Sequence, residues 1–521
     1  MPTGTVSDIR TFKGLERRLR ADRIGVPGLL LSVAASSAPL MVTAGVMPTT
    51  YGTMGIVGQP LLFVILGVVL TLFSFGYAEM SRHVHNAGAF YAYIARGLGG
   101  TAGTAASVVA LVAYSTMQFG IYGIFGFEVA GLLDKYLGVA VGWWVPALAG
   151  VVAIGVCGWL KIDLNARVLG FLLIAECAMV AVFDIAGLDS PGKDGITLHA
   201  FDPATLSGAG LGTALCFTIA SFVGFEQAAV YAEETSCPQV TVARVTFLAV
   251  GLTAVLFAAG SWALGVAAGP SQIVRLARKE GPDLLFTLAQ DRLGTGFTDV
   301  MHLFYVTGMF AAMLSFHNVV ARYAFAMGRE GLLPAAVGRT ARSSGAPAHG
   351  SLLQSGVSLL AVAVFAVTDG RPHGDPTAPV LHLFTWMGNV GALGIIVLMA
   401  AAGVAVIAFF VRRGAARAQA PRLIASGVAA AALVVIAGYA VTDFHVLLGA
   451  APDSALRWIL PGIIGAAVVL GLGYGLVLKA VRPQVHARIG LGNEAFQLEK
   501  AAKAAKAARG SDKPPHHARR A

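Results

Sequence analysis

The sequence predicts an all-α membrane protein that crosses the bilayer about twelve times. Of its 521 residues, 56% are hydrophobic and only 12% are charged, and the mean hydropathy is +0.73, whereas a soluble domain has about 25% charged residues. A transmembrane helix needs roughly 20 predominantly apolar residues to cross about 30 Å of hydrocarbon. Stretches that approach this length lie near residues 27–47, 60–82, 100–128, 142–160, 164–187, 207–232, 244–267, 298–325, 350–368, 380–411, 423–442 and 457–479.

The distribution of basic residues predicts the orientation of these helices. Cytoplasmic loops carry an excess of Lys and Arg, and most of the 37 Lys and Arg residues fall on one side when the N-terminus is placed in the cytoplasm. Both termini are then cytoplasmic, as basic tails at 1–26 and 481–521 around a transmembrane domain at 27–480. The C-terminal EKAAKAAKAARG, from Glu499, either forms a helix on anionic lipid or remains a solvated tail.

This asymmetry accounts for the formal net charge of +10 without a nucleic-acid partner, so the expected partner is the lipid bilayer. The motifs HExxH, GxSxG and GxxxxGK[ST] do not occur in the sequence. We therefore expect no cofactor, no metal and no ATP hydrolysis, and energy has to come from a gradient or from exchange. The four cysteines, which form no CxxC pair, are Cys157, Cys177, Cys216 and Cys237.

Two of the predicted spans are interrupted in their middle. In SVAASSAPLMVTAG, from Ser32 to Gly45, Pro39 cannot donate an intrahelical hydrogen bond and suits the first position of a new half-helix. Ser36 and Ser37 lie where hydroxyl groups can cap a helix or bind a ligand. In hydrocarbon, non-helical backbone survives only where it is buried in protein or lines a watery cavity. The interruption therefore predicts a cavity.

The second interruption lies in the sixth span, at Ser221-Phe222-Val223-Gly224-Phe225. Gly224 is conformationally permissive and lies near the middle of the span. Taken singly, each break also has a simpler interpretation as a kink or a packing point, because Gly and Pro occur in transmembrane helices for those reasons.

The placement of the two breaks favours a functional interpretation. They fall in the first members of two five-span sets, about 27–187 and 207–411, and an odd number of spans gives the sets opposite orientations. This is the inverted repeat of a secondary transporter, in which substrate binds near the midplane between discontinuous helices. The spans at about 423–479 are then two additional helices. A channel or receptor is disfavoured because neither requires paired breaks.

Helix dipoles indicate what such a site binds. The second half-helices, after Pro39 and Gly224, present N–H groups and partial positive charge, which suit a carboxylate. The first halves end near Ala35 and Ala220 and present unpaired carbonyls, which suit an ammonium group. An α-amino acid satisfies both ends, and a polyamine with two amines is the alternative. The predicted substrate-binding residues are Ser36, Ser37, Ala38, Pro39, Ala220, Ser221, Phe222, Val223 and Gly224.

Two regions resemble the amino-acid permeases of the amino-acid, polyamine and organocation (APC) superfamily. They are GQPLLFVILGVVLTLFSFGYAEMSRHVHNAGAFYAYIARGLG, from Gly58 to Gly99, and SFVGFEQAAVYAEETSCPQVTVARVT, from Ser221 to Thr246. The twelve-span plan extends the resemblance over about residues 24–480. It implies a five-plus-five inverted repeat with broken helices 1 and 6, a leucine-transporter-like fold, with substrate held at the breaks and alternating access.

The chain departs from these permeases at both breaks. Ala38-Pro39-Leu40 replaces the Gly-rich signature that is frequent at the first break. Ala220 stands where several members carry a gating aromatic residue, and Phe217 or Phe222 is the candidate to take that role.

Candidate coupling residues lie in the fifth and sixth spans. LNARVLG, from Leu164 to Gly170, resembles the stretch in which sodium-independent relatives place a basic side chain where sodium-coupled relatives bind an ion. Arg167 occupies the matching position, and it is either a fixed cation substitute or a positive-inside anchor. Glu226 is a candidate proton or gating site. Ionisable residues within a membrane mark pathways, which adds Glu176 and Asp184.

Polar residues on other spans are candidates for the side-chain pocket. Tyr114, Gln118 and Tyr122 share one face of the third span, where they either line the pocket or hydrogen-bond between helices. Phe217 and Trp386 are further gating or pocket candidates.

The sequence thus predicts an integral, multi-pass plasma-membrane permease that moves amino acids by alternating access. We expect it to be sodium-independent and either proton-coupled or exchanging. The alternatives are a polyamine or other organic-cation transporter of the same fold and, more distantly, a membrane-embedded enzyme. The oligomeric state stays open.

Overall fold

The computed structural model describes residues 25–492, except 160–161, 236, 342–344, 370–376 and 450. Most of the two predicted basic tails, including EKAAKAAKAARG, lies outside the described residues. The side chains of 162–169, and with them the predicted coupling residue Arg167, also lie outside the described part.

The described elements are helices, and they confirm the predicted all-α polytopic architecture. Within the described residues, eleven segments are long and apolar enough to cross a membrane. The remaining predicted span, at 142–160, is the shorter apolar helix α8 (Trp144–Trp159). The eleven segments contain α2 to α4 (Val26–Gly52), α5 (Gln59–Ser81), α7 (Gly100–Leu137), α9 (Ile162–Asp189), α10 (Leu211–Ala220) with η5 (Phe225–Ala229), α11 (Pro238–Ala268), α14 (Thr295–Glu330), α15 (Ala348–Asp369), η7 (Pro379–Met387) with α16 (Gly388–Arg412), α17 (Ala420–Leu447) and α18 (Ile459–Val481).

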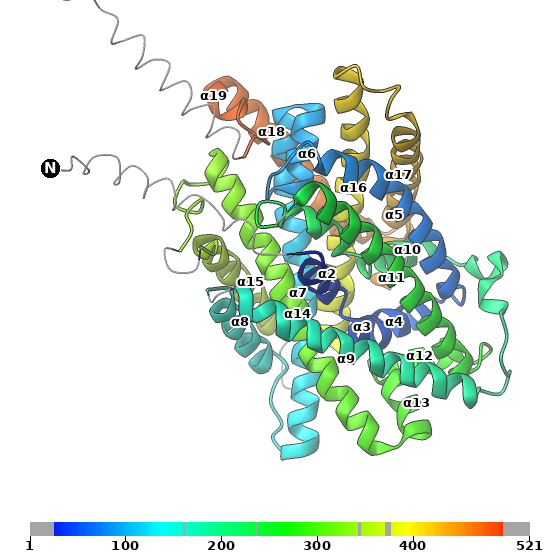
Figure 1. Cartoon of the computed structure of the whole chain (residues 1–521). Coiled ribbons are helices and arrows are strands. Elements are labelled where there is room, and N and C mark those ends of the chain that lie inside the picture. Colours follow the sequence, from blue (N-terminus) through cyan, green and yellow to red (C-terminus); the bar gives the residue numbers. More distant parts are fainter. Residues whose placement is uncertain are drawn as a thin grey trace, which may run out of the picture.

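Shorter helices lie at the two ends of the bundle (Figure 1). One end carries α6 (Ala89–Leu98) and α19 (Pro483–His486), and the opposite end carries α12 (Ile273–Glu280) and α13 (Leu284–Leu293). We refer to them as the α6–α19 end and the α12–α13 end. The positive-inside distribution predicts that the α6–α19 end is cytoplasmic.

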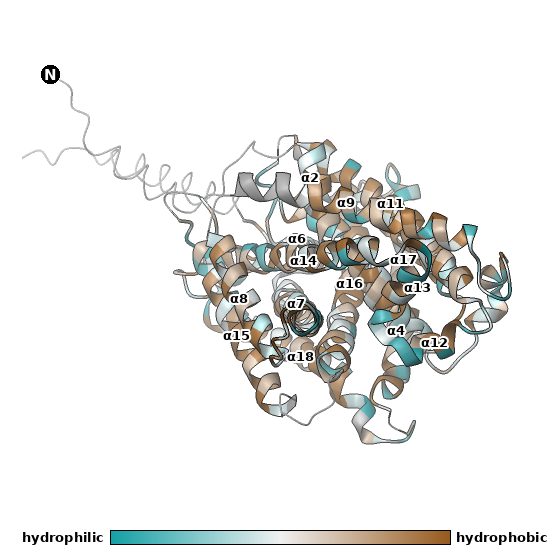
Figure 2. Ribbon diagram, turned by 90° about the horizontal axis from the view of Figure 1, so that it is seen from below, coloured by the Kyte–Doolittle hydropathy of each residue, from teal (hydrophilic) through white to brown (hydrophobic). Residues whose placement is uncertain are grey.

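Helix α7 runs through the middle of the bundle. It is seen end-on in Figure 2, and it contacts α6, α8, α14, α16 and α18. Large apolar side chains on the outer helices are exposed, such as Val255 on α11 and Val367 on α15. In a membrane protein these outward side chains contact lipid, because lipid tails are as apolar as the side chains themselves.

The two broken segments lie inside this bundle. In each of them 83% of the most apolar stretch is buried, against 33% in α17 and in α18. A helix that is apolar all round and buried contacts protein on every side. The breaks are therefore enclosed by other helices, as non-helical backbone at membrane depth requires.

The chain after the second break differs from the sequence prediction of a second half-helix. After α10 the backbone turns through 221–224, forms the short 3-10 helix η5 and continues through turns to Thr235. Side chains hold this stretch in place of a regular helical ladder. Tyr77 donates to the backbone oxygen of Glu226 at 2.9 Å, and Glu234 pairs with Arg322 of α14.

Candidate functional site

The first break lies between α2 (Val26–Ala34) and α3 (Pro39–Met41), with the 3-10 turn η1 (Ala35–Ser37) between them. Ala38 has φ 34° and ψ 84°, a left-handed conformation that is unusual for a residue other than glycine. It redirects the chain, and Pro39 begins the next half-helix at the position that suits a residue without an N–H. The predicted break is thus present at the predicted residues.

The serines of the first break hydrogen-bond to the half-helix that precedes them. The Ser36 hydroxyl donates to the backbone oxygen of Val33 at 2.5 Å, and the Ser37 hydroxyl donates to that of Ala34 at 2.6 Å. Both bonds go to carbonyls of the last turn of α2 and hold the two serine side chains against the end of that helix.

The second break is centred on Gly224, which has φ 137° and ψ −41°. Its N–H donates to Oε2 of Glu226 at 2.9 Å, and the Tyr114 hydroxyl donates to Oε1 of the same carboxylate at 2.7 Å. Glu226 is fully buried. A buried carboxylate requires hydrogen-bond partners of this kind, so the predicted coupling residue Glu226 and the predicted pocket residue Tyr114 belong to one hydrogen-bonded unit.

The two breaks contact each other directly. The Ser36 hydroxyl lies 3.3 Å from the backbone oxygen of Val223. A Cβ atom built on Gly224 would lie 2.0 Å from the Ser36 Oγ and 2.7 Å from the backbone oxygen of Val33. The absence of a side chain at Gly224 therefore permits the close approach as well as the positive φ.

A second protein carboxylate lies at the first break. Oε2 of Glu176, on α9, accepts the N–H of Leu40 at 3.2 Å, and only 2% of the residue is exposed. The carboxylate packs against Gly308 of α14, where a Cβ would lie 2.2 Å from Oε1. Each break thus has a backbone N–H that donates to a buried glutamate, Glu176 at the first break and Glu226 at the second.

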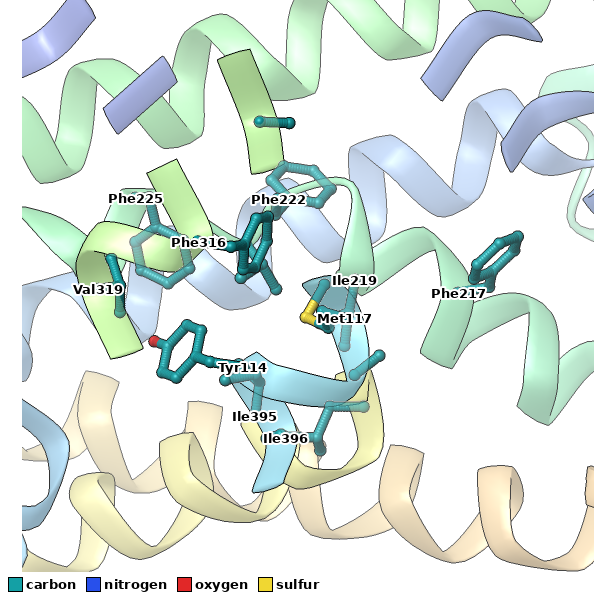
Figure 3. Packing of buried hydrophobic residues seen from close by; sticks show 14 of the residues in the cluster. Tyr114, Met117, Phe217, Ile219, Phe222, Phe225, Phe316, Val319, Ile395 and Ile396 are labelled. Atoms are coloured by element: carbon teal, nitrogen blue, oxygen red, sulfur yellow. The ribbon is translucent and has the colours of Figure 1, made fainter. Parts of the chain in front are cut away.

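A small cavity lies between the breaks, with a volume of about 30 Å³, close to the share of one water molecule in the liquid. The side chains that face it are mostly apolar and come from α7, α10, α14 and the segments around the breaks. Figure 3 shows several of them in the buried core, including Met117, Phe217 and Phe316. The lining residues are Ser36, Ser37, Met41, Val42, Val46, Met117, Ile121, Phe217, Ala220, Ser221, Phe316, Phe384 and Gly388.

The cavity brings together part of the predicted site. Ser36, Ser37, Ala220 and Ser221 line it, and so does the predicted gating residue Phe217. Within the described part of the chain the buried Ser221 hydroxyl has no hydrogen-bond partner. An unpaired buried hydroxyl is costly, so Ser221 is available to a polar ligand.

Other predicted residues lie at the breaks but do not face this cavity. Ala38 and Pro39 form the backbone turn itself. The backbone oxygen of Val223 lies 3.3 Å from the Ser36 hydroxyl. The Phe222 ring packs on Phe63, with 6.0 Å between ring centres.

Gln118 and Trp386 have hydrogen-bond partners away from the cavity. The Gln118 amide donates to the backbone oxygen of Met313 at 3.2 Å and accepts from Gln354 at 2.8 Å, which links α7, α14 and α15. The Trp386 indole donates to the backbone oxygen of Leu447 at 2.9 Å. Of the two uses that the sequence left open for the polar face of α7, Gln118 makes interhelical hydrogen bonds.

Sequence reasoning missed the apolar half of the cavity. Phe384 lies in the π-helical segment η7, and Val42 and Val46 lie in a second π-helical segment, η2 (Val42–Val46). Such segments are frequent at functional sites, but no residue type specifies them. Met117 offered a detectable signal, because it lies on α7 beside Tyr114 and Gln118.

Buried ion pairs close the α6–α19 end. Arg322 donates to both carboxylate oxygens of Glu234, at 2.7 and 3.2 Å, and its guanidinium lies 4.2 Å from the centre of the Tyr231 ring. Arg329 pairs with Glu233 at 2.6 Å. Both glutamates of this end are therefore paired with arginines of α14.

The α12–α13 end is closed by different contacts. Nδ1 of His302 lies 2.5 Å from Oε1 of Glu128, and the His302 ring stacks on Phe286 at 3.8 Å. The Tyr51 hydroxyl donates to the backbone oxygen of Ser261 at 2.8 Å. Contacts between helices thus lie at both ends of the bundle, and the cavity between the breaks is too small for an amino acid.

Spanning helices arranged around two broken segments that meet at a buried cavity define a membrane transporter for a small molecule. A family model described as "Amino acid permease" matches residues 30–469. The chain therefore belongs to the amino acid permease family of the APC superfamily, and the resemblance inferred from the two sequence motifs is confirmed. No curated protein matches the chain.

Proposed function

We propose that this permease moves amino acids across the plasma membrane by alternating access, with both termini in the cytoplasm. The observation that carries the proposal is the contact between the two breaks, which brings Ser36, Ser37 and Ser221 to one cavity. The helical segments that end beside these serines have carbonyl-bearing ends, which suit the ammonium of an α-amino acid, and N–H-bearing ends, which suit its carboxylate. The inverted repeat over about 27–187 and 207–411 belongs to the same proposal.

The two buried glutamates indicate how binding is coupled to opening. In the closed conformation Glu176 accepts the Leu40 N–H and Glu226 accepts the Gly224 N–H. A substrate carboxylate competes with Glu176 for the same kind of donor when the cavity widens. In the closed conformation each glutamate thus accepts the N–H group that a substrate carboxylate would otherwise bind. The N–H groups of Leu40 and Gly224 therefore have an acceptor while the site is closed.

The second candidate is an organic cation or polyamine transporter. It is favoured by the same two acidic side chains, since Arg322, which contacts the segment after the second break, already pairs with Glu234. An ammonium group without a carboxylate would have two buried acidic side chains at the breaks and no competing substrate charge.

A matched ligand set separates these candidates. The purified protein is tested by thermal shift against an amino acid, the amine that lacks its carboxylate and the acid that lacks its amine, for several side chains. A ligand that binds the folded state raises the apparent stability. Stabilisation by the amino acid alone supports the proposal, and equal stabilisation by the amine supports the cation alternative. Stabilisation by none of the three compounds, for any side chain, contradicts both.

Coupling is proposed to be sodium-independent, with proton symport or exchange as the energy source. Arg167 is proposed as the fixed cation that replaces a sodium ion, and Glu226 as the proton or gating residue. Uptake into vesicles should be unchanged when sodium is replaced by potassium and should respond to a proton gradient or to internal substrate. Replacing Arg167 by Ala should slow uptake, and unchanged uptake would leave Arg167 as a positive-inside anchor.

A further inference from the structure

A second and larger pocket lies at the α6–α19 end, away from the broken helices. Its volume is about 420 Å³. Helix α6, the end of α16 and the chain around α19 form its walls. The lining residues are Ala95, Arg96, Gly100, Phe409, Arg412, Arg413, His486, Ala487, Ile489 and Leu491. We call it the basic pocket.

The basic pocket concentrates positive charge. Arg96, Arg412 and Arg413 line it together with His486, and no lining residue is acidic. Among the described residues neither Arg412 nor Arg413 has a carboxylate partner. The Arg413 guanidinium lies 4.2 Å from the centre of the Phe409 ring, which orients its charge by a cation–π contact.

Negative groups near the basic pocket already have partners. Glu79 lies 3.0 Å from Arg422 and 3.5 Å from Arg82. Glu330 accepts the N–H groups of Gly490 and Gly492 at 2.9 and 3.0 Å. The C-terminal ends of α6 and α16 add only partial negative charge, which is smaller than the full charges of three guanidinium groups.

The wall around α19 is packed onto the bundle. Nε2 of His486 lies 3.0 Å from the Thr101 hydroxyl, and Ile489 is 4% exposed. Gly100 permits this wall to pack closely on α7, since a Cβ at Gly100 would lie 2.7 Å from the backbone oxygen of His486. Together with the two bonds to Glu330, these contacts fix the pocket wall in position.

We propose that the basic pocket binds a phosphate group, presented by an anionic lipid of the leaflet that faces the α6–α19 end. Several arginines that line one pocket suit a phosphate, because the planar guanidinium forms bidentate hydrogen bonds with its oxygens. Basic pockets between transmembrane helices on the cytoplasmic side bind lipid headgroups. Val411, beside Arg412, is 56% exposed, so the end of α16 borders the lipid. A free phosphate anion offers the same chemistry from solution.

Binding there also stabilises the closed end of the transporter. The phosphate joins α6 and α16 to the segment that holds Glu330, and Glu330 follows Arg329 of the closing ion pair. A bound headgroup is therefore expected to raise the thermal stability of the whole bundle.

The test uses the full chain in nanodiscs without phosphate buffer, with thermal unfolding and native mass spectrometry as readouts. The three conditions are phosphatidylcholine alone, phosphatidylcholine with phosphatidylglycerol, and phosphatidylcholine with inorganic phosphate. The variants are Arg412→Gln/Arg413→Gln and the triple variant that adds Arg96→Gln. The matched control, Arg417→Gln/Lys479→Gln/Arg482→Gln, removes three exposed charges near the same end but outside the pocket.

Phosphatidylglycerol should raise the Tm of the wild-type protein and remain bound in the mass spectrum. The double variant should lose most of both effects, the triple variant all of them, and the control neither. A rise with phosphatidylglycerol but not with inorganic phosphate identifies a lipid headgroup, whereas a rise with both identifies a general phosphate site. Equal loss in the control, or no rise in either condition, overturns the proposal. Unchanged elution of the variants in phosphatidylcholine shows that they remain folded.

Discussion

At the scale of the residue, the proposed transport site depends on a few backbone positions at which a side chain has little room or is strained. Gly224 combines φ 137° with contact distances that leave no room for a Cβ. Ala38 adopts φ 34° despite its side chain, at a cost on the order of 1–2 kcal/mol for an L-residue. Strain of this kind persists where the surrounding structure holds it, and it concentrates at functional sites.

Replacing Gly224 by Ala or Val should therefore abolish substrate binding while the protein still inserts. The new Cβ would strike Ser36 and the backbone of Val33, and the positive φ adds strain, so the two breaks have to move apart. Ligand-induced thermal shift measures the loss. Gly438→Ala on α17 is the control, because its Cβ would meet nothing within 4 Å. Binding close to wild type in the Gly224 variants would show that the break is not needed.

The role of Glu176 can be tested by replacing it with Gln, which keeps an acceptor oxygen for the Leu40 N–H. A hydrogen bond to a charged group is roughly twice as strong as a neutral one. A substrate carboxylate then competes with a weaker hydrogen-bond acceptor. The affinity for amino acids should therefore stay the same or rise by up to about tenfold, which corresponds to 1.4 kcal/mol. An organic cation should instead bind more weakly, because one of the two acidic side chains at the breaks is gone. Isothermal titration with the matched ligands from the thermal-shift screen distinguishes the outcomes.

At the scale of the element, the segment from Phe225 to Thr235 has the most unusual construction. It replaces helical turns by contacts to neighbouring helices, through Tyr77, Arg322 and Arg329. These contacts fix the segment only while α5 and α14 keep their places. A shift of either helix therefore frees the segment, which suits an element that closes one end of a transporter.

The buried pair of Arg322 and Glu234 should show the energetic signature of a desolvated ion pair. Removing one partner leaves an uncompensated charge and should destabilise the closed protein by roughly 3–5 kcal/mol. We expect Arg322→Met and Glu234→Met each to be strongly destabilising, and the double variant to be far less so than their sum. Chemical unfolding in mixed micelles provides the measurement.

Lys279→Met is the control for this cycle, because the Lys279–Glu280 pair is exposed and such pairs contribute little. Strictly additive effects of the two substitutions would mean that Arg322 and Glu234 do not interact as the structure shows.

At the scale of the whole molecule, the proposed alternating access requires the two ends of the bundle to open in turn. The α6–α19 end is held by buried ion pairs, and the α12–α13 end by the contact of Glu128 with His302 and by packing of α12 on α4 (Met47–Gly52). Opening one end breaks only the contacts of that end. Substrate and lipid can therefore shift the balance between the two states, provided that they bind one state better than the other.

The proposed orientation has a direct test in the native Cys237, which is exposed beside the α6–α19 end. A membrane-impermeant maleimide should label it only after cells are permeabilised. Thr295→Cys at the opposite end, in a Cys237→Ser background, should be labelled in intact cells. Labelling of Cys237 in intact cells would reverse the proposed topology and, with it, the leaflet assigned to the basic pocket.

The sequence was sufficient for the all-α architecture, for the order of the spanning helices and for the position of both breaks, although the predicted span at 142–160 is the shorter helix α8. Hydropathy over a window of about 20 residues is a local quantity, and Pro39 and Gly224 impose their backbone preferences wherever they stand. Serines and small residues at the breaks were found by the same local reasoning. The family followed from two long motifs.

Only the tertiary structure decided which groups these breaks meet. The bond from Leu40 to Glu176 joins residues 136 positions apart, and the pairing of Glu234 with Arg322 depends on how α14 packs. Phe384 reaches the cavity from a π-helical segment that no residue type marks. The sequence alone determined where the helices run and where they break, because those properties depend on neighbouring residues. Packing decided which carboxylates and rings face the breaks, because those contacts depend on the relative positions of distant helices.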